Sequence, residues 1–298
     1  MSAYLLQTAM ITPLTSDGHL DTLALKRLIQ RILAAQHIGL SILGSTGEGA
    51  SLSLSLRRQV REAVLERVNG QQPVYSGIVG TVQEDIVKDL DACRDLPLAG
   101  LLIPPPSYYP MTARDLEVFY LSLADRSPFP IMLYNIPPYT KISIPVEVVA
   151  KLSTHPHIMG IKDSSRDFDY FLRVLHRTRD IPDFKVLIGT ETLVLPALAV
   201  GGHGAVVGSG NIVPQWIVEL AEHVAHNRWP EARQLEYQLI DLATALRQTD
   251  GVRGFKFATA AIDHHLGYLM APYQPLPQDA PAALAIRDVL KRYHLISE

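Results

Sequence analysis

The chain has a single cysteine, Cys93, among its 298 residues. One cysteine cannot form an intramolecular disulfide, so disulfide-stabilised scaffolds are excluded and a reducing compartment fits. The N-terminal segment lacks a basic stretch and a small-residue cleavage site, and no apolar run approaches the roughly 20 residues that span a bilayer. We therefore expect a cytoplasmic protein without a membrane partner.

Charge is also sparse. Charged residues make up 19% of the chain, and the formal net charge is −3. This balance provides no basic field for nucleic acid or an anionic membrane, so we expect no nucleic-acid partner. Because 47% of the residues are hydrophobic, the composition predicts a large core and contacts between subunits.

Eight short runs of β-branched and apolar residues alternate with longer segments of helical spacing. The predicted strands are 9–12, 39–44, 74–79, 100–103, 131–135, 158–162, 185–188 and 204–207. Eight strand–helix units predict an α/β fold, a closed (β/α)₈ TIM barrel. An open doubly wound sheet is the alternative, but its glycine-rich fingerprint is missing after the first strand, where the sequence reads Thr12-Pro13-Leu14-Thr15.

The helical segments are marked by apolar side chains on one face and by polar starts. Asp21 precedes the first helix and Thr112 precedes the fourth, and both residue types favour helix N-termini. Strand signals stop after residue 225, and helical patterns follow at 230–248, 253–266 and 281–293. We therefore predict a barrel domain over residues 1–227 and a C-terminal helical domain over residues 228–298.

Four features stand at or just after the C-terminal ends of predicted strands, where barrels of this kind have their active sites. The first is Gly44-Ser45-Thr46-Gly47-Glu48. Its glycines can turn successive backbone N–H groups toward an anion, to which the hydroxyls add donors, so a carboxylate would suit this loop. The alternative is a loop that only caps the next helix.

The second feature is Tyr134-Asn135-Ile136-Pro137 at the end of the fifth strand. A tyrosine at this place can donate and accept a proton beside a substrate. The alternative is a tyrosine that packs against the barrel rim with its hydroxyl hydrogen-bonded.

The third feature is Gly160-Ile161-Lys162-Asp163 on the sixth strand. Strand alternation predicts Ile158, Gly160 and Lys162 on one face, with Gly160 leaving room below an inward-pointing amine. Burial disfavours the charged form of an amine, so a neutral nucleophile becomes available near neutral pH. The alternative is a lysine that extends from the strand end into solvent.

The fourth feature is the loop Pro104-Pro105-Pro106-Ser107-Tyr108-Tyr109-Pro110 after the fourth strand. Its prolines stiffen the backbone and hold the tyrosine pair in place. These aromatic side chains could serve catalysis, a subunit contact or both.

Together, the GSTGE loop, the YNxP strand and the GIKD strand resemble the N-acetylneuraminate lyase and dihydrodipicolinate synthase superfamily, from about residue 8 to residue 212. The resemblance implies a TIM barrel with C-terminal helices, assembled as a homotetramer (a dimer of dimers). It also implies class I aldolase chemistry without a cofactor, beginning with a Schiff base between pyruvate and a lysine.

The resemblance assigns roles by position. It implies that Lys162 forms the imine and that Tyr134 is the acid/base, linked by Thr46 to a proton relay. Tyr108 would be the relay tyrosine contributed to a neighbouring subunit, with Tyr109 as the alternative. The implied substrate-binding residues are Ser45 and Thr46 for the pyruvate carboxylate, and Gly189 and Val206, through backbone groups, for the rest of pyruvate.

The identity of the second substrate is inferred from positions where this sequence differs from the dihydrodipicolinate synthases and from the sialic acid lyases. Dihydrodipicolinate synthases usually carry an arginine five residues after the YNxP tyrosine, whereas this chain has Tyr139. A tyrosine cannot replace a bidentate guanidinium, although Lys141 or another cation could reach the site. Sialic acid lyases use an Asp-Glu pair and a serine, where this chain has Thr190-Glu191 and Gly208.

Tyr139, Thr190 and Glu191 are therefore predicted to line the site of the second substrate, and the last two could bind sugar hydroxyls. The predicted function is an aldolase that cleaves a 2-keto-3-deoxy sugar acid to pyruvate and a hydroxyaldehyde, or the reverse. The alternatives are 4-hydroxy-tetrahydrodipicolinate synthase, which condenses pyruvate with aspartate semialdehyde, and a related 2-oxo-acid dehydratase or deaminase.

Three other classes compete. A phosphate-binding barrel would use the glycines around the eighth strand, namely Gly201, Gly202, Gly204, Gly208 and Gly210. A metal enzyme is not expected, because neither His264-His265 nor His155 with His157 has the spacing of a metal site. In a non-catalytic barrel that binds 2-oxo acids, an imine-forming lysine would have no use.

Overall fold

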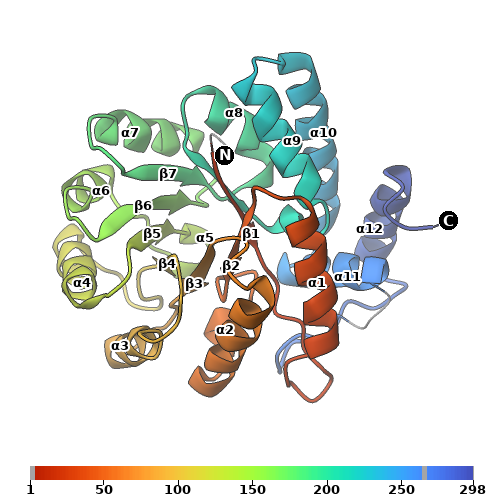
Figure 1. Cartoon of the computed structure of the whole chain (residues 1–298), viewed down its shortest axis with the longest axis horizontal. Coiled ribbons are helices and arrows are strands. Elements are labelled where there is room, and N and C mark those ends of the chain that lie inside the picture. Colours follow the sequence, from red (N-terminus) through yellow and green to blue (C-terminus); the bar gives the residue numbers. More distant parts are fainter. Residues whose placement is uncertain (1–3, 264–266, 298) are drawn as a thin grey trace.

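The computed structural model describes residues 4–263 and 267–297, and its centre is a closed barrel of eight parallel strands (Figure 1). Each strand pairs with the next, and the eighth pairs with the first. The predicted (β/α)₈ barrel is therefore confirmed. The strands are β1 (Leu5–Ala9), β2 (Gly39–Ile42), β3 (Val74–Gly77), β4 (Gly100–Ile103), β5 (Ile131–Asn135), β6 (Ile158–Asp163), β7 (Lys185–Ile188) and β8 (Gly204–Val207).

The helices surround the barrel (Figure 1), and three of them follow its last strand–helix unit. The barrel helices are α1 (Thr22–Ala34), α2 (Leu54–Val68), α3 (Gln83–Asp91), α4 (Ala113–Arg126), α5 (Pro137–Thr140), α6 (Val146–Leu152), α7 (Phe168–Thr178), α8 (Val194–Ala199) and α9 (Pro214–Ala225). The C-terminal helices are α10 (Trp229–Leu246), α11 (Val252–Asp263) and α12 (Pro281–Arg292). A domain boundary after residue 227 stays a prediction. In the described ranges, no helix combines the length and apolarity needed to cross a membrane.

Two predicted helix starts are confirmed. The Asp21 carboxylate accepts hydrogen bonds from the first backbone N–H groups of α1. Thr112 and Asp115 form a capping box at the start of α4, in which each side chain accepts from the other residue's backbone N–H.

The predicted position of the first strand, 9–12, is wrong, because β1 ends at Ala9. The following residues are as buried as a strand, but side chains and loops satisfy their polar groups. The backbone N–H of Ile11 donates to the side chain of Asn211 at 3.0 Å, and the Thr12 hydroxyl donates to the carbonyl of Gly47 at 2.7 Å. An apolar run therefore marks burial here rather than membership of the sheet.

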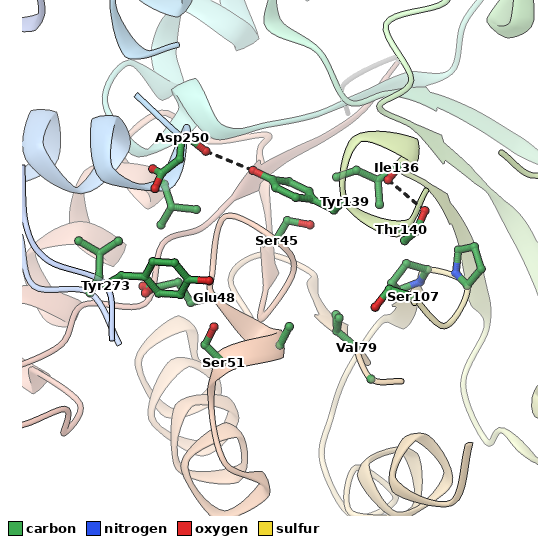
Figure 2. Close-up of a pocket in the computed structure, with 16 residues that line it drawn as sticks. Ser45, Glu48, Ser51, Val79, Ser107, Ile136, Tyr139, Thr140, Asp250 and Tyr273 are labelled. Atoms are coloured by element: carbon green, nitrogen blue, oxygen red, sulfur yellow. Dashed lines mark hydrogen bonds between the residues drawn. The ribbon is translucent and has the colours of Figure 1, made fainter. Parts of the chain in front are cut away.

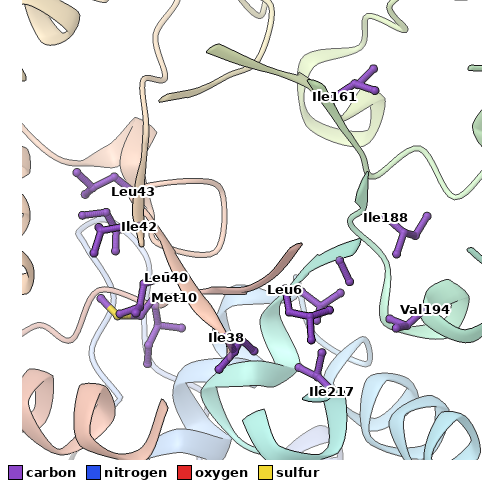
Figure 3. Packing of buried hydrophobic residues seen from close by; sticks show 14 of the residues in the cluster. Leu6, Met10, Ile38, Leu40, Ile42, Leu43, Ile161, Ile188, Val194 and Ile217 are labelled. Carbon is purple, nitrogen blue, oxygen red and sulfur yellow. The ribbon is translucent and has the colours of Figure 1, made fainter. Parts of the chain in front are cut away.

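Buried side chains form two layers. The larger layer fills the space between strands and helices, and Figure 3 shows part of it, including Leu40 and Ile42 of β2 and Ile188 of β7. A smaller cluster fills the barrel interior, and its members are Ala9, Leu102, Met132, Tyr134, Ile136, Leu187 and Val206. The interior layer forms the floor of the site described next.

The predicted alternation along β6 is partly wrong. The register with β5 shifts between Ile131 and Met132, so that Met132 pairs with Gly160. Ile158 consequently joins the outer layer, while Met159 packs against the interior cluster. Such an irregularity inserts a residue into one strand and changes which side chains face inward.

Candidate active site

Lys162 and Tyr134 lie side by side at the C-terminal ends of β6 and β5. The two residues are paired in the register of the neighbouring strands. Their side chains are almost completely buried, with 4% and 3% of their surface exposed. The Lys162 Nζ atom lies 4.2 Å from the centroid of the Tyr134 ring. The barrel therefore holds a primary amine against a phenol in a nearly dry environment.

Gly189, just after β7, creates the space for the Lys162 side chain. A Cβ atom at this position would lie 2.8 Å from Lys162 Cε and 2.0 Å from the Ser164 hydroxyl oxygen. The prediction that Gly160 provides this space is wrong. A Cβ at Gly160 would instead meet the backbone oxygen of Lys185 at 2.2 Å, so this glycine allows β6 and β7 to approach each other.

The GSTGE loop brings hydroxyl groups to the same place. The Ser45 hydroxyl oxygen lies 3.4 Å from that of Tyr134. The loop is closed by two backbone hydrogen bonds, from the N–H of Glu48 to Ser45 O and from that of Gly49 to Gly44 O. Ser45, rather than Thr46, thus has its hydroxyl within reach of the tyrosine, while Thr46 lines the wall of the same cavity.

A cavity of about 360 Å³ opens above these groups. It contains all the sequence-predicted site residues except Tyr108. The predicted residues in its wall are Ser45, Thr46, Tyr134, Tyr139, Lys162, Gly189, Thr190, Glu191 and Val206. Tyr108 and Tyr109 lie outside the cavity, with 84% and 76% of their surface exposed.

Glu191 has both carboxylate oxygens engaged by the protein. One oxygen accepts the backbone N–H of Gly208 at 3.0 Å, and the other lies 3.3 Å from a guanidinium nitrogen of Arg247. The side chain is buried. This carboxylate therefore connects the β7 and β8 ends to α10, although it also lines the cavity.

Five polar residues of the cavity wall were missed by sequence analysis. They are Ser164 and Arg166 after β6, and Arg247, Thr249 and Asp250 after α10. No local pattern marks them, because their role depends on where the chain returns over the barrel. Figure 2 shows the Tyr139 ring between Asp250 and Ile136, with its hydroxyl donating to the Asp250 carbonyl at 3.3 Å. Partial burial raises the pKa of the Tyr139 phenol, and the positive charge of Arg166 acts in the opposite direction.

A second cavity of about 350 Å³ adjoins the first and is drawn in Figure 2. The two cavities share Ser45, Ile136, Tyr139, Asp250 and Val252 as lining residues. Glu48 lies in the wall of the second cavity, where its carboxylate forms a buried ion pair with Lys256 of α11. The GSTGE loop is thereby attached to the C-terminal helices.

The Asp163 carboxylate connects the end of β6 to Asn135 of β5 and to Ser165 of the following turn. Burial raises the pKa of this carboxyl, and hydrogen bonds from Asn135 and Ser165 partly oppose the shift. The Asn135 amide donates to Asp163 at 2.8 Å and accepts the backbone N–H of Ile144 at 3.0 Å. The hydrogen bond between Asn135 and Asp163 thus joins the YNxP segment to the GIKD segment.

Packing explains four of the five glycines around β8, whereas Gly201 has open space around it and a φ of 93°. A Cβ at Gly204 would lie 2.0 Å from the Leu5 backbone oxygen, and one at Gly208 would lie 2.4 Å from the Phe255 ring. Among the described residues, no group of three or more metal-ligating side chains occurs. His264 and His265 lie outside the described residues.

Comparison with known proteins agrees with this arrangement. The model of the dihydrodipicolinate synthetase family matches residues 4–291. A 4-hydroxy-tetrahydrodipicolinate synthase of Methanosphaerula palustris is 31% identical over 287 residues, covering 96% of this chain and 97% of the relative.

Solved structures of the same family superpose on almost the whole chain. The structure of dihydrodipicolinate synthase from Thermotoga maritima superposes with a TM-score of 0.94 at 26% identity, covering 99% of this chain and all of that one. A prophage protein of the dihydrodipicolinic acid synthase family from E. coli K12, solved in complex with pyruvate, gives a TM-score of 0.92 at 25% identity. The matched regions cover 98% of this chain and 99% of that one.

Proposed function

Since the chain belongs to the dihydrodipicolinate synthetase family, we propose that it is a carbon–carbon lyase that binds pyruvate as a Schiff base on Lys162. The observation that carries the proposal is the buried Lys162 amine, 4.2 Å from the Tyr134 ring centroid at the bottom of a polar cavity. An unprotonated amine is the nucleophile that this chemistry needs, and Lys162 Nζ is placed at the cavity to act as one.

In the first half-reaction, the lone pair of Lys162 Nζ adds to C2 of pyruvate. The carbonyl π electrons move to oxygen, which receives a proton, and the nitrogen loses one. A second proton on that hydroxyl lets it leave as water, while the nitrogen lone pair forms the C=N bond of the protonated imine. Tyr134 is the group placed to deliver and remove these protons, because its phenol borders both the amine and Ser45.

In the second half-reaction, the imine acts as an electron sink. The C3 proton leaves, and its electron pair forms the enamine and neutralises the nitrogen. C3 then attacks an aldehyde carbon, and the aldehyde oxygen takes up a proton. Water adds to the restored imine, which releases the product and the free amine, and cleavage runs through the same steps in reverse.

The pyruvate carboxylate would bind beside the GSTGE loop. Ser45 and Thr46 present hydroxyl and backbone groups at the cavity wall, where an anion would receive preorganised hydrogen bonds. Gly189 and Val206 line the same cavity, where their backbone groups would border the rest of pyruvate.

The names of the relatives favour aspartate semialdehyde as the second substrate, and with it 4-hydroxy-tetrahydrodipicolinate synthase activity, over the sugar-acid cleavage expected from the sequence. One observation supports the sugar-acid aldolase as a second candidate. Tyr139 stands where a guanidinium would grip the aldehyde's carboxylate, and its hydroxyl is already hydrogen-bonded to Asp250.

A substrate panel separates these candidates. Pyruvate is supplied with aspartate semialdehyde in one arm, and 2-keto-3-deoxy sugar acids are supplied alone in the other, with pyruvate release measured enzymatically. Turnover in either arm supports the lyase and identifies its branch. Absence of turnover in both, together with pyruvate that binds but cannot be trapped as an imine, would leave a binding-only barrel.

The exposed Tyr108–Tyr109 pair supports assembly as a homotetramer. The two rings pack edge to face, with their centroids 5.0 Å apart, and face solvent in the isolated chain. Tyr108 holds a backbone φ of 93°, which is unusual for a residue with a side chain. Within the assembly, Tyr108 would complete the proton relay of a neighbouring subunit, and a fully active monomer in solution would contradict this assignment.

A further inference from the structure

The charges around the Lys162 cavity are unequally neutralised. Glu191 is paired with Arg247, and Asp250 is paired with Arg253 at 2.6 Å. Arg166 also lines the cavity, and its guanidinium has neither a hydrogen bond nor an ion pair with any of residues 4–263 and 267–297. A positive charge next to a substrate cavity thus lacks a counter-charge among the residues that the structure describes.

The backbone at Arg166 adopts a conformation that is costly for any residue with a side chain. Its φ is 67°, in the left-handed region where glycine is favoured. Such strained residues persist when the surrounding structure fixes them, and they cluster at ligand sites. The turn between β6 and α7 therefore retains an arginine in a position where glycine would be the relaxed choice.

Arg166 and Tyr139 line the same cavity, and the positive charge of Arg166 opposes the rise that burial causes in the pKa of the Tyr139 phenol. The Tyr139 hydroxyl has one proton to donate, and the Asp250 carbonyl accepts it. Lys141, the other nearby cation named from the sequence, does not line the cavity, and its amine donates to the Pro138 carbonyl at 2.8 Å. The turn after β6 therefore supplies the cavity with a guanidinium that has no ion pair among the described residues.

We propose that Arg166 determines the specificity for the second substrate by binding an anionic group, a carboxylate or a phosphate, carried by the aldehyde. This inference rests on the proposed Schiff-base lyase and names the class of its partner as an acidic aldehyde. Five fixed N–H donors allow a guanidinium to hold either anion through two parallel hydrogen bonds. The arginine missing at position 139, in α5, would thus be replaced by one from the turn between β6 and α7.

The test compares two variants with the parent enzyme. Arg166→Gly removes the cation and suits the left-handed backbone, so this variant should fold. Arg173→Ala is the control, because Arg173 is an exposed arginine of α7 outside the cavity. Each enzyme receives pyruvate with matched aldehydes: butyraldehyde against succinate semialdehyde for the carboxylate, and glyceraldehyde against glyceraldehyde 3-phosphate for the phosphate.

For the parent enzyme, the anionic member of at least one pair should have the higher kcat/KM. In Arg166→Gly, this kcat/KM should fall by about 10- to 100-fold, as expected for loss of a charge-assisted hydrogen-bonded pair. The neutral aldehydes should be unaffected, and Arg173→Ala should behave as the parent. Equal effects on charged and neutral aldehydes, or no effect on either, would overturn the assignment.

Borohydride trapping of pyruvate distinguishes failure of the lyase proposal from failure of the Arg166 proposal. Arg166→Gly should still trap pyruvate on Lys162, since the imine forms before the aldehyde binds. If the parent enzyme traps no pyruvate, the lyase proposal fails and the Arg166 assignment fails with it. Normal trapping without discrimination between charged and neutral aldehydes overturns the assignment to Arg166 alone.

Discussion

Replacing Lys256 with methionine should destabilise the protein far more than removing an exposed ion-pair partner. Lys256 is 1% exposed, and its ammonium pairs with the buried Glu48 carboxylate and donates to the Tyr268 carbonyl at 2.6 Å. The other Glu48 oxygen accepts the backbone N–H of Met270 at 2.9 Å. The substitution leaves a buried carboxylate without its counter-ion.

The expected magnitude follows from burial. Removing one partner of a buried ion pair typically costs about 3–5 kcal/mol, because the remaining charge stays desolvated. The exposed pair of Arg177 and Glu147, with side chains 57% and 74% exposed, provides the control. Arg177→Ala should cost less than about 1 kcal/mol.

The assay is urea denaturation of the parent, Lys256→Met, Glu48→Gln and the double variant. The double variant should be less destabilised than the sum of the single variants, with a coupling energy near the top of the range of about 0.5–3 kcal/mol. Additive costs, or a Lys256→Met cost no larger than that of Arg177→Ala, would refute the reasoning. Because Glu48 belongs to the loop of Ser45 and Thr46, Lys256→Met should also lower kcat.

Three further predictions concern the site and its surroundings. Tyr134→Phe should lower kcat by about 10²-fold or more through loss of acid/base catalysis, and near-normal turnover would reassign Tyr134 to packing. Gly189→Ala should slow borohydride trapping of pyruvate at Lys162, since the added Cβ would lie 2.8 Å from Lys162 Cε, and unchanged trapping would contradict this steric account. Burial raises the pKa of Glu236 from 4.5 to about 7, so the folded state holds a proton that the unfolded state releases. Stability should therefore fall between about pH 4.5 and pH 7, by about 3 kcal/mol from this group. Glu236→Gln should remove that part of the pH dependence in urea denaturation at pH 5 and pH 8, and an unchanged pH dependence would exclude the shift.

The fold was predictable because alternating periodicities are a local property of the sequence. Five of the eight predicted strands, among them β4 and β5, begin and end within one residue of the observed bounds. The first strand was misplaced because burial alone does not distinguish a strand from a loop whose backbone is satisfied by a side chain such as Asn211. The face occupied by Ile158 was misread because a register shift between neighbouring strands leaves no mark in the sequence.

The centre of the site was predictable for a topological reason. The C-terminal ends of all barrel strands meet at one face, so Lys162, Tyr134 and the GSTGE loop had to converge there. The wall of the cavity was not predictable from the strands. Arg247 and Asp250 come from just after α10. That Arg166 has no ion-pair partner in the described part of the chain becomes apparent only when the partners of its neighbours are known.

Covalent trapping tests the central claim most directly. The protein is incubated with pyruvate and borohydride, digested and analysed by mass spectrometry, with Lys162→Ala as the control. The account predicts one reduced pyruvate adduct, located on Lys162 and absent from the variant. No adduct under conditions where pyruvate binds, or an adduct on a different lysine, would contradict it.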